Sequence, residues 1–370
     1  MSKKISIQQI LADGREYWAD GRYGPWVTKM FEQVTKCRTR ALGAEMYRNN
    51  EGEMQIFPDT CKTRLCPPCG WKATLNWQET FLNRLPEVGF AEINFTMPSD
   101  LWSIFRQNPE LLADLPAIGS QVVASWVKKR FGAQVMIMVV LQTFGGDLKF
   151  NPHLHMVVSI KGFNSAQERV VEDIRFPKDR LMRAWRYAVL DYLELASNFG
   201  RLKNSWEKVN VTRLVKRHRD RLWQVWVRYH RNLRRTLEYV SRYILRPPLP
   251  EYKIVEYQDG KVTFRIKNTK LKCFMDETKS TEDFIAILTR HAPVRYRHGI
   301  RYFGLLAPRS IVGCFAVFCK LIRYRRPARI RPFGWARSIW RAYRRDPLAS
   351  RTGGQRLYWW RHLPPIESGP

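Results

Sequence analysis

The sequence predicts an α+β protein in which an antiparallel hairpin lies among long helices. Residues 134–144 and 153–160 are two apolar runs, and Gly145-Gly146-Asp147 breaks the chain between them. Apolar runs joined through a short glycine-rich connection are typical of an antiparallel pair of strands. Residues 178–245 look mainly helical instead, and Pro247-Pro248 ends this pattern because proline cannot continue a helix.

Shorter elements are expected on either side of this hairpin. A short strand at residues 91–95 leads into a helix that continues to about Arg130, with Ser99 or Asp100 as its N-terminal cap. Residues 251–274 alternate in the manner of strands, and Asp259-Gly260 is the expected turn of a second hairpin.

The net charge restricts the class of partner. The 370 residues include 64 Lys and Arg against 33 Asp and Glu, which gives a formal net charge of +31. This balance excludes most enzymes of small metabolites and indicates a polyanionic partner, nucleic acid before an anionic membrane surface. Residues 201–246 contain fourteen basic and three acidic residues, and Trp206, Trp223, Trp226 and Tyr229 lie between them.

Three regions are expected along the chain. Residues 1–75 form a cysteine-rich module, residues 85–290 contain the predicted hairpins and helices, and residues 291–370 form a basic C-terminal region. That last region has seventeen basic residues and two acidic ones. Because 45% of the residues are hydrophobic, the chain can bury a substantial core.

Nothing in the sequence predicts a membrane protein. The longest apolar stretches, residues 135–141 and 311–319, are far shorter than the ~20 residues that a spanning helix needs. The N-terminus has no long apolar signal core, so an intracellular protein is expected. In a reducing compartment, clustered cysteines favour a metal site over disulfides.

His153 and His155 form the first group of residues that could carry chemistry. On a strand, residues two apart project to the same face, so both imidazoles can bind one metal ion. Gln142 falls roughly opposite the pair in the predicted hairpin and offers an oxygen ligand. Three protein ligands with open positions are typical of a catalytic metal site. The alternative is a pair of exposed histidines or histidines satisfied within the core.

Tyr239 and Tyr243 form the second group. Tyrosines four residues apart lie on one face of a helix, which is most often a packing arrangement. Here the surrounding residues are basic, and cations favour the phenolate form and attract phosphate. The basic neighbours are Arg234, Arg235, Arg242 and Arg246.

Three cysteines form the third group. Cys66 and Cys69 have the Cys-x2-Cys spacing of zinc thiolate sites, and Cys61 lies five residues before them. Cys37, 24 residues upstream of Cys61, is the nearest candidate for a fourth ligand. The alternative is three buried free thiols.

Several segments, in order along nearly the whole chain, resemble rolling-circle insertion-sequence transposases of the "insertion sequence ninety-one" type. These belong to the two-tyrosine class of HUH nucleases. The segments are CRTRALG at 37–43, CKTRLCPPCGWKA at 61–73, LQTFGGDLKFNPHLHMVVS at 141–159, YVSRYILRPPL at 239–249, VTFRIKN at 262–268 and IRYFGLLAPRS at 300–310.

The resemblance implies a fold, a site and a reaction. The fold is a central antiparallel sheet with flanking helices, beside a zinc-type module and a basic DNA-binding C-terminal region. His153 and His155 correspond to the HUH pair that holds Mg²⁺ or Mn²⁺, and Tyr239 and Tyr243 to the nucleophiles. The activity is cleavage and rejoining of single-stranded DNA through a covalent 5′-phosphotyrosine, at element termini and targets. The implied location is the bacterial cytoplasm, at the nucleoid.

The sequence also departs from the family pattern. A further Cys-x2-Cys pair is absent between Cys37 and Cys61, and another is absent from residues 346–354. Gln142 and Asn151 stand where the family often has histidine. These departures leave two alternatives to an active transposase: a DNA-binding relic that cannot cut, and a replication initiator of a plasmid or phage.

Overall fold

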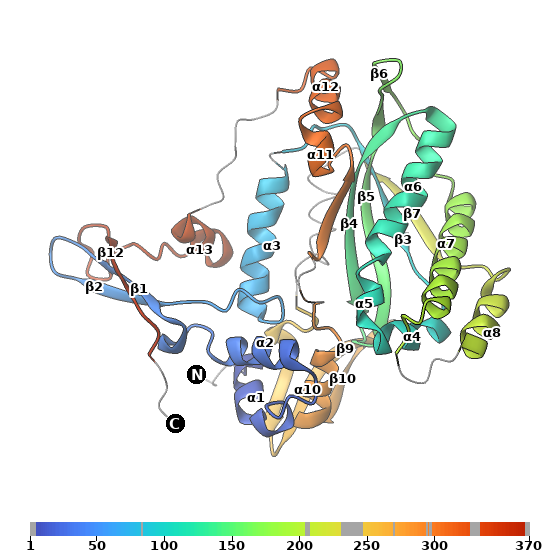
Figure 1. Cartoon of the computed structure of the whole chain (residues 1–370). Coiled ribbons are helices and arrows are strands. Elements are labelled where there is room, and N and C mark those ends of the chain that lie inside the picture. Colours follow the sequence, from blue (N-terminus) through green and yellow to red (C-terminus); the bar gives the residue numbers. More distant parts are fainter. Residues whose placement is uncertain are drawn as a thin grey trace.

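A computed structural model describes residues 5–82, 84–203, 208–230, 247–268, 271–293, 295, 298–325 and 334–366. These residues form three antiparallel sheets with helices packed between and around them (Figure 1). The predicted α+β class is confirmed. Among the described residues, no helix combines the length and the apolar character that crossing a membrane requires.

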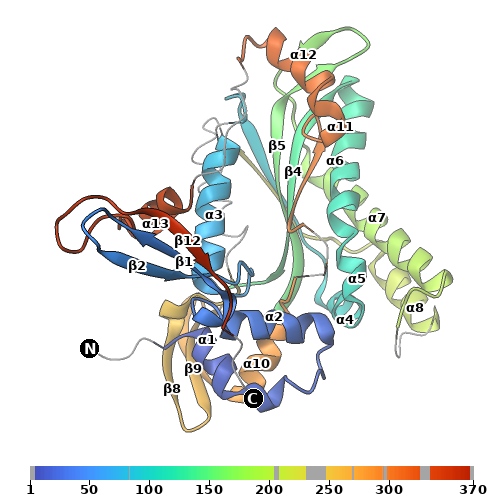
Figure 2. The same cartoon turned by 60° about the vertical axis from the view of Figure 1, so that its left-hand side comes forward.

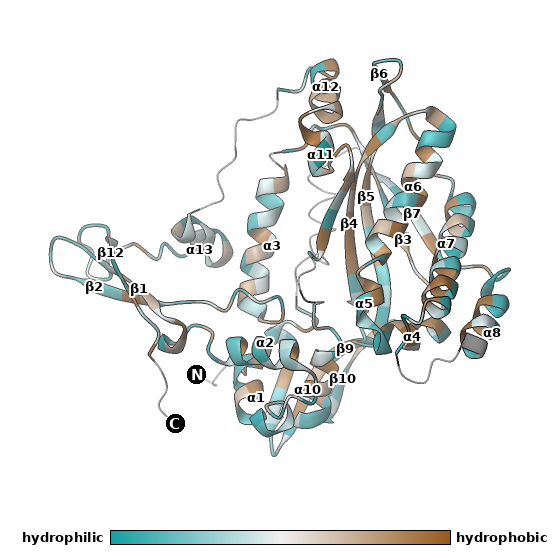
Figure 3. Cartoon of the chain, in the orientation of Figure 1, coloured by the Kyte–Doolittle hydropathy of each residue, from teal (hydrophilic) through white to brown (hydrophobic). Residues whose placement is uncertain are grey.

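The largest sheet has the strand order β11-β4-β5-β3-β7, and β6 pairs with β5 outside this path. Its strands are β3 (Phe90–Phe95), β4 (Gln134–Phe144), β5 (Phe150–Asn164), β6 (Arg169–Val171), β7 (Val225–His230) and β11 (Ile300–Gly304). β4 and β5 are the hairpin that the sequence predicts, and hydrophobic residues gather along both strands (Figure 3). They give this central sheet two largely buried faces.

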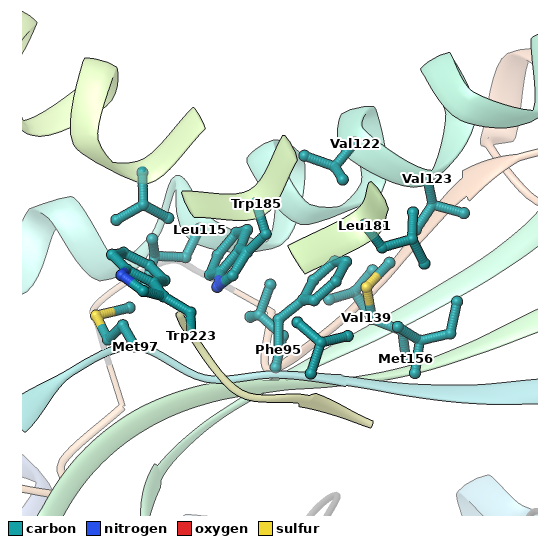
Figure 4. Packing of buried hydrophobic residues seen from close by; sticks show 14 of the residues in the cluster. Phe95, Met97, Leu115, Val122, Val123, Val139, Met156, Leu181, Trp185 and Trp223 are labelled. Atoms are coloured by element: carbon teal, nitrogen blue, oxygen red, sulfur yellow. The ribbon is translucent and has the colours of Figure 1, made fainter. Parts of the chain in front are cut away.

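One face of the central sheet is covered by helices that come before and after the hairpin. These are α4 (Trp102–Gln107), α5 (Pro109–Leu112), α6 (Leu115–Phe131), α7 (Lys178–Asn198) and α8 (Lys208–His218). The ring of Trp185 from α7 stacks on Phe95 of β3 with centroids 4.9 Å apart, and its indole N–H donates to the Thr96 carbonyl (Figure 4). This contact fixes α7 against β3, next to the edge strand β7.

The opposite face is packed at one end by α3 (Pro67–Leu82) and α12 (Cys314–Leu321), and Ile311 of α11 (Pro308–Ile311) lines a small cavity there with Phe81. Phe81 of α3 and Phe318 of α12 are buried there against Met138 and Val157 of the hairpin. The other end of this face carries the two histidines.

A second sheet, of order β10-β9-β8, packs with the N-terminal helices. Its elements are β8 (Ile254–Gln258), β9 (Lys261–Asn268) and β10 (Cys273–Ser280), with α1 (Ile7–Asp13), α2 (Pro25–Thr35) and α10 (Thr281–Thr289). The turn expected at Asp259-Gly260 is confirmed, and both residues have positive φ, 49° and 66°. Such angles suit a tight turn between two twisted strands.

The third sheet joins the two ends of the chain. β1 (Ala44–Arg48) lies between β2 (Met54–Pro58) and β12 (Tyr358–Leu363). α13 (Trp335–Tyr343) packs on α3, with an ion pair between Arg341 and Glu79. Two views show α3 between this sheet and the central one (Figures 1 and 2). Because β11 and β12 pair with β4 and β1, strand pairing crosses the expected boundaries at 75 and 291, and that division stays a prediction.

Two local expectations are wrong. Residues 225–230 form a strand rather than helix, because their β-branched and aromatic side chains pair in register with β3. Neither Ser99 nor Asp100 caps a helix through its side chain; both lie inside a 3-10 turn, Ser99–Leu101. The Asp100 carboxylate instead lies 3.0 Å from His218 Nε2. The remaining 3-10 turns of the described residues are Arg15–Tyr17, Arg40–Leu42 and Glu251–Lys253.

Candidate catalytic centre and zinc site

His153 and His155 project from β5 to one face of the central sheet and meet there. Their Nε2 atoms lie 3.1 Å apart, and their rings meet edge to face with centroids 4.9 Å apart. This is the same-face arrangement that the His-x-His spacing predicts. Both Nε2 atoms can therefore coordinate the same cation.

Hydrogen bonding fixes the state of the first imidazole. The Asn151 carbonyl oxygen lies 2.7 Å from His153 Nδ1, and a carbonyl can only accept. Nδ1 therefore carries the proton of the neutral ring, and Nε2 presents its lone pair. Burial lowers the pKa of His153, and burial together with the His153 charge lowers the pKa of His155 to about 3. Neutral imidazoles are the metal-binding form.

Amide oxygens surround the histidine pair. Gln142 lies directly opposite His153 in the β4–β5 register and is only 6% exposed. Its Oε1 atom is buried without a hydrogen-bond partner in the described structure, and so is Oδ1 of Asn151. A buried carbonyl oxygen without a partner is costly, and a bound cation would satisfy it. Two neutral imidazoles with amide oxygens suit Mg²⁺ or Mn²⁺.

Sequence reasoning missed a third oxygen near this site. Asn94 of β3 lies directly opposite His155, and its Oδ1 is also buried without a hydrogen-bond partner in the described structure. Its amide nitrogen donates to the buried Glu92 carboxylate at 3.0 Å, which leaves the oxygen available. The available signal was the alternation in AEINF, where Glu92 and Asn94 are the polar positions of an apolar strand.

A small basic cavity of about 70 Å³ adjoins Gln142. Arg64, His291, His298 and Arg301 are among its lining residues. Burial lowers the pKa of Arg64 to about 10, which still leaves its guanidinium charged at neutral pH. The Arg301 guanidinium donates to the Ala113 carbonyl at 2.8 Å, which holds the side chain in place. The cavity thus offers positive charge next to Gln142.

The tyrosine segment cannot be placed against this centre. Tyr239 and Tyr243 lie outside the described residues, together with the basic residues Arg234, Arg235, Arg242 and Arg246. Their roles stay predictions. β7 ends at His230, directly before that segment. The Nε2 atom of His230 lies 3.5 Å from the Glu92 carboxylate.

The four cysteines of the N-terminal module converge. Cys37 follows α2, Cys61 follows β2, and Cys66 and Cys69 lie at the start of α3. All four sulfur atoms lie within 4.8 Å of one another, and three of the pairs are 3.7 Å apart. Zinc–sulfur bonds of about 2.3 Å give a tetrahedron with edges of about 3.8 Å, so the spacing fits one zinc ion.

Hydrogen bonding among the thiols prepares some of them for ionisation. Contacts with Cys37 and Cys66 lower the pKa of Cys61 to about 7, and contacts with Cys37, Cys61 and Cys66 lower the pKa of Cys69 well below its usual range. Thiolate is the form that binds metal. The same contacts raise the pKa of Cys37 and Cys66, so hydrogen bonding favours thiolates at Cys61 and Cys69 in particular.

Comparisons with known proteins identify the family and support the zinc site. Residues 136–311 match the family profile described as "Putative transposase", and residues 9–97 match "Transposase zinc-binding domain". The chain is 30% identical over 292 residues to the transposase for insertion sequence element IS801 of Pseudomonas savastanoi pv. phaseolicola. That match covers 75% of this chain and 70% of the relative.

A second relative gives the same result. The putative transposase y4qJ of Sinorhizobium fredii is 28% identical over 299 residues, which cover 76% of this chain and 74% of the relative. No solved structure matches. The chain is thus a transposase with a zinc-binding domain at its N-terminus, a protein that cleaves and transfers DNA strands. It belongs to the IS91 family of insertion-sequence transposases.

Proposed function

We propose that this transposase is an HUH enzyme that nicks and rejoins single-stranded DNA in rolling-circle transposition. The observation that carries the proposal is the convergence of His153 and His155, with Nε2 atoms 3.1 Å apart beside the buried Gln142 oxygen. A small cavity with Arg64 and Arg301 among its lining residues adjoins the same glutamine. This combination suits a metal-assisted reaction at a phosphodiester.

His153, His155 and Gln142 would hold Mg²⁺ or Mn²⁺, which polarises a phosphoryl oxygen when it is bound. Asn94 is positioned to orient or complete this set from β3. Asn151 holds His153 in the tautomer that presents Nε2. Arg64 would provide positive charge near the scissile phosphate, because it lines the cavity that adjoins Gln142.

The proposed nucleophile is the phenol oxygen of Tyr239 or Tyr243. It loses its proton and forms a bond to phosphorus at the cleavage site, and the bond from phosphorus to the 3′-oxygen breaks. That oxygen takes up a proton and leaves as a free 3′-hydroxyl, while the 5′-phosphate stays on the tyrosine. A 3′-hydroxyl of another strand reverses the step, so strand transfer needs no nucleotide cofactor.

The partner is single-stranded DNA of the element termini and of the target, at the nucleoid in the bacterial cytoplasm. Arg234, Arg235, Arg242 and Arg246 are the proposed phosphate contacts near the tyrosines. Cys37, Cys61, Cys66 and Cys69 are the proposed ligands of a structural zinc ion. The proposed zinc module is residues 1–75, the proposed nuclease domain is residues 85–290, and the proposed basic DNA-binding region is residues 291–370.

An oligonucleotide cleavage assay tests the proposal. Labelled single strands from the element's own termini are incubated with protein and Mn²⁺, and we expect cleavage that a chelator abolishes. The His153→Ala/His155→Ala variant should still bind these strands without cutting them, because basic segments provide most of the affinity. Undiminished cleavage by this variant would refute the metal site. Binding without cleavage by the wild type would instead indicate a relic.

A further inference from the structure

The third sheet has one face that packs against α13 and a second face that does not. On the covered face, Trp335 of α13 packs against Tyr47 and Phe57, with ring centroids 5.5 and 4.8 Å apart. Strand pairing places Arg48 and Tyr358 side by side on the other face. Because side chains alternate along a strand, this second face is separate from the α13 contact.

The second face carries an alternation of arginine and aromatic rings. The Arg48 guanidinium lies 4.8 Å from the Trp360 ring and 5.8 Å from the Tyr358 ring, and Arg361 lies 4.4 Å from Trp360. An irregularity in the β1–β12 register after Met46 allows Trp360 to join this face. Tyr358 is 42% exposed, so its ring remains accessible.

The charged residues of this face, Arg48 and Arg361, are both basic. Glu45, the acidic residue of β1, belongs to the covered face, where it accepts hydrogen bonds from Trp359 and lies 3.1 Å from His362 Nδ1. In the described part of the chain, neither Arg48 nor Arg361 forms an ion pair. A partner that complements this face must therefore present both anions and flat apolar rings.

We propose that this face, formed by Arg48, Tyr358, Trp360 and Arg361, binds unpaired nucleotides of single-stranded DNA. Bases stack on the Tyr358 and Trp360 rings, and the two arginines contact the phosphates between them. Residues two apart on a strand are about 6–7 Å apart along it, which leaves room for successive bases. Duplex DNA cannot bind in this way, because its bases are stacked on each other and cannot stack on the protein's rings.

This inference rests on the proposed function only in taking single-stranded DNA as the partner. The face belongs to a different sheet from His153 and His155, and α3 lies between the two sheets (Figures 1 and 2). The proposed face therefore holds DNA away from the cleavage centre. Binding and cutting can be measured separately.

The test measures binding of a fluorescent oligothymidine to the full-length protein at several salt concentrations. We expect Tyr358→Ala/Trp360→Ala to weaken binding about tenfold with the salt dependence unchanged, since stacking is not ionic. We expect Arg48→Gln/Arg361→Gln, which keeps long polar side chains, to reduce the log–log salt slope by about 1.4, or about 0.7 per lost phosphate contact.

Phe274→Ala is the matched control. Phe274 is 63% exposed on β10 with the Lys253 ammonium 5.9 Å from its ring, so it is an exposed cation–aromatic pair on another sheet. It should bind oligothymidine like the wild type. Wild-type binding by both double variants, or an equal loss in Phe274→Ala, would overturn the proposal. A wild type that binds but never cuts would refute the proposed function and leave this inference standing.

Discussion

Gln142 is a polar residue that the fold buries on β4, opposite His153. Its Oε1 atom is buried without a hydrogen-bond partner in the described structure. In a protein that only needed a stable sheet, an apolar side chain would be favoured at this place, because an unsatisfied buried amide destabilises the folded state. We infer that the glutamine is retained for what its oxygen binds.

Replacing Gln142 with methionine should therefore separate stability from metal binding. Met is close in shape to Gln and lacks the unsatisfied oxygen, so the metal-free variant should be more stable than the wild type by about 1 kcal/mol. Its Mn²⁺ affinity should fall at least tenfold. Urea unfolding with a chelator and calorimetric titration with Mn²⁺ measure the two effects.

Gln134→Met is the control for this substitution. Gln134 begins the same strand but is exposed, so its change should alter neither quantity. A Gln142→Met protein that binds Mn²⁺ as tightly as the wild type would show that Gln142 is not a ligand.

The cysteine cluster connects elements that are far apart in sequence. Cys37, Cys66 and Cys69 are buried in the same hydrophobic cluster as Phe264 of β9 and Phe284 of α10. From the sequence, loss of zinc is expected to destabilise the first 75 residues more than the nuclease core. The packing indicates that zinc also supports the second sheet.

Removal of zinc should accordingly loosen both parts. A structural zinc ion contributes folding free energy to the elements that contact its ligands. We expect amides of α2, β9 and α10 to exchange hydrogen faster in the chelated protein, while β4 and β5 keep their protection. Hydrogen exchange with mass spectrometry measures this. Unchanged exchange in α10 would show that the coupling is absent.

Hydrogen bonds to Glu53 hold the loop before β12 against the β1–β2 hairpin. Glu53 accepts hydrogen bonds from the Ser350 hydroxyl and the Arg351 backbone, and these bonds lower its pKa to about 2. A carboxylate with a lowered pKa stabilises the folded state above its unfolded pKa of about 4.3. That contribution is lost as the pH falls toward 2.

Glu53→Gln should release this loop at neutral pH. Trypsin should then cut faster after Arg351 and Arg356, because an unfastened loop opens more often. Gel analysis of timed digests measures the rate. Glu110→Gln, which removes only a surface ion pair with Lys203, is the control. Equal digestion of both variants would mean that Glu53 does not hold the loop.

Local patterns made some elements predictable and left others hidden. The β4–β5 hairpin followed from two apolar runs and a short turn, and the convergence of His153 and His155 followed from strand geometry. Cys37 was predicted as the fourth zinc ligand only because it is the nearest other cysteine along the chain. Its sulfur does lie in the cluster. β7 was missed because it lies inside the basic stretch 201–246, within the residues that were expected to be mainly helical.

Pairings distant in sequence could not be predicted. β1 and β12 are separated by almost the whole chain, so no local signal joins them. Asn94 reaches His155 only because β3 pairs with β5, which depends on the whole sheet. The segment of Tyr239 and Tyr243 lies outside the described residues, and its part in the site rests on resemblance.

At the scale of the whole molecule, the net charge of +31 governs binding. A protein that neutralises phosphates releases counterions, so its affinity for a single strand falls with salt by a log–log slope of about −0.7 per phosphate. Five contacts would give a slope of about −3.5. Anisotropy titrations at several salt concentrations measure it. A slope near zero would show that the basic surfaces do not bind DNA.

Mapping of the covalent DNA adduct tests the central claim most directly. The protein is incubated with a cleavable terminus strand and Mn²⁺, then digested, and the peptide that carries a 5′-phosphonucleotide is sequenced by mass spectrometry. We predict attachment at Tyr239 or Tyr243, loss of the adduct in His153→Ala/His155→Ala and in Tyr239→Phe/Tyr243→Phe, and a more severe single defect for Tyr243→Phe. DNA attached to neither tyrosine, or an adduct that forms without the histidine pair, would contradict the account.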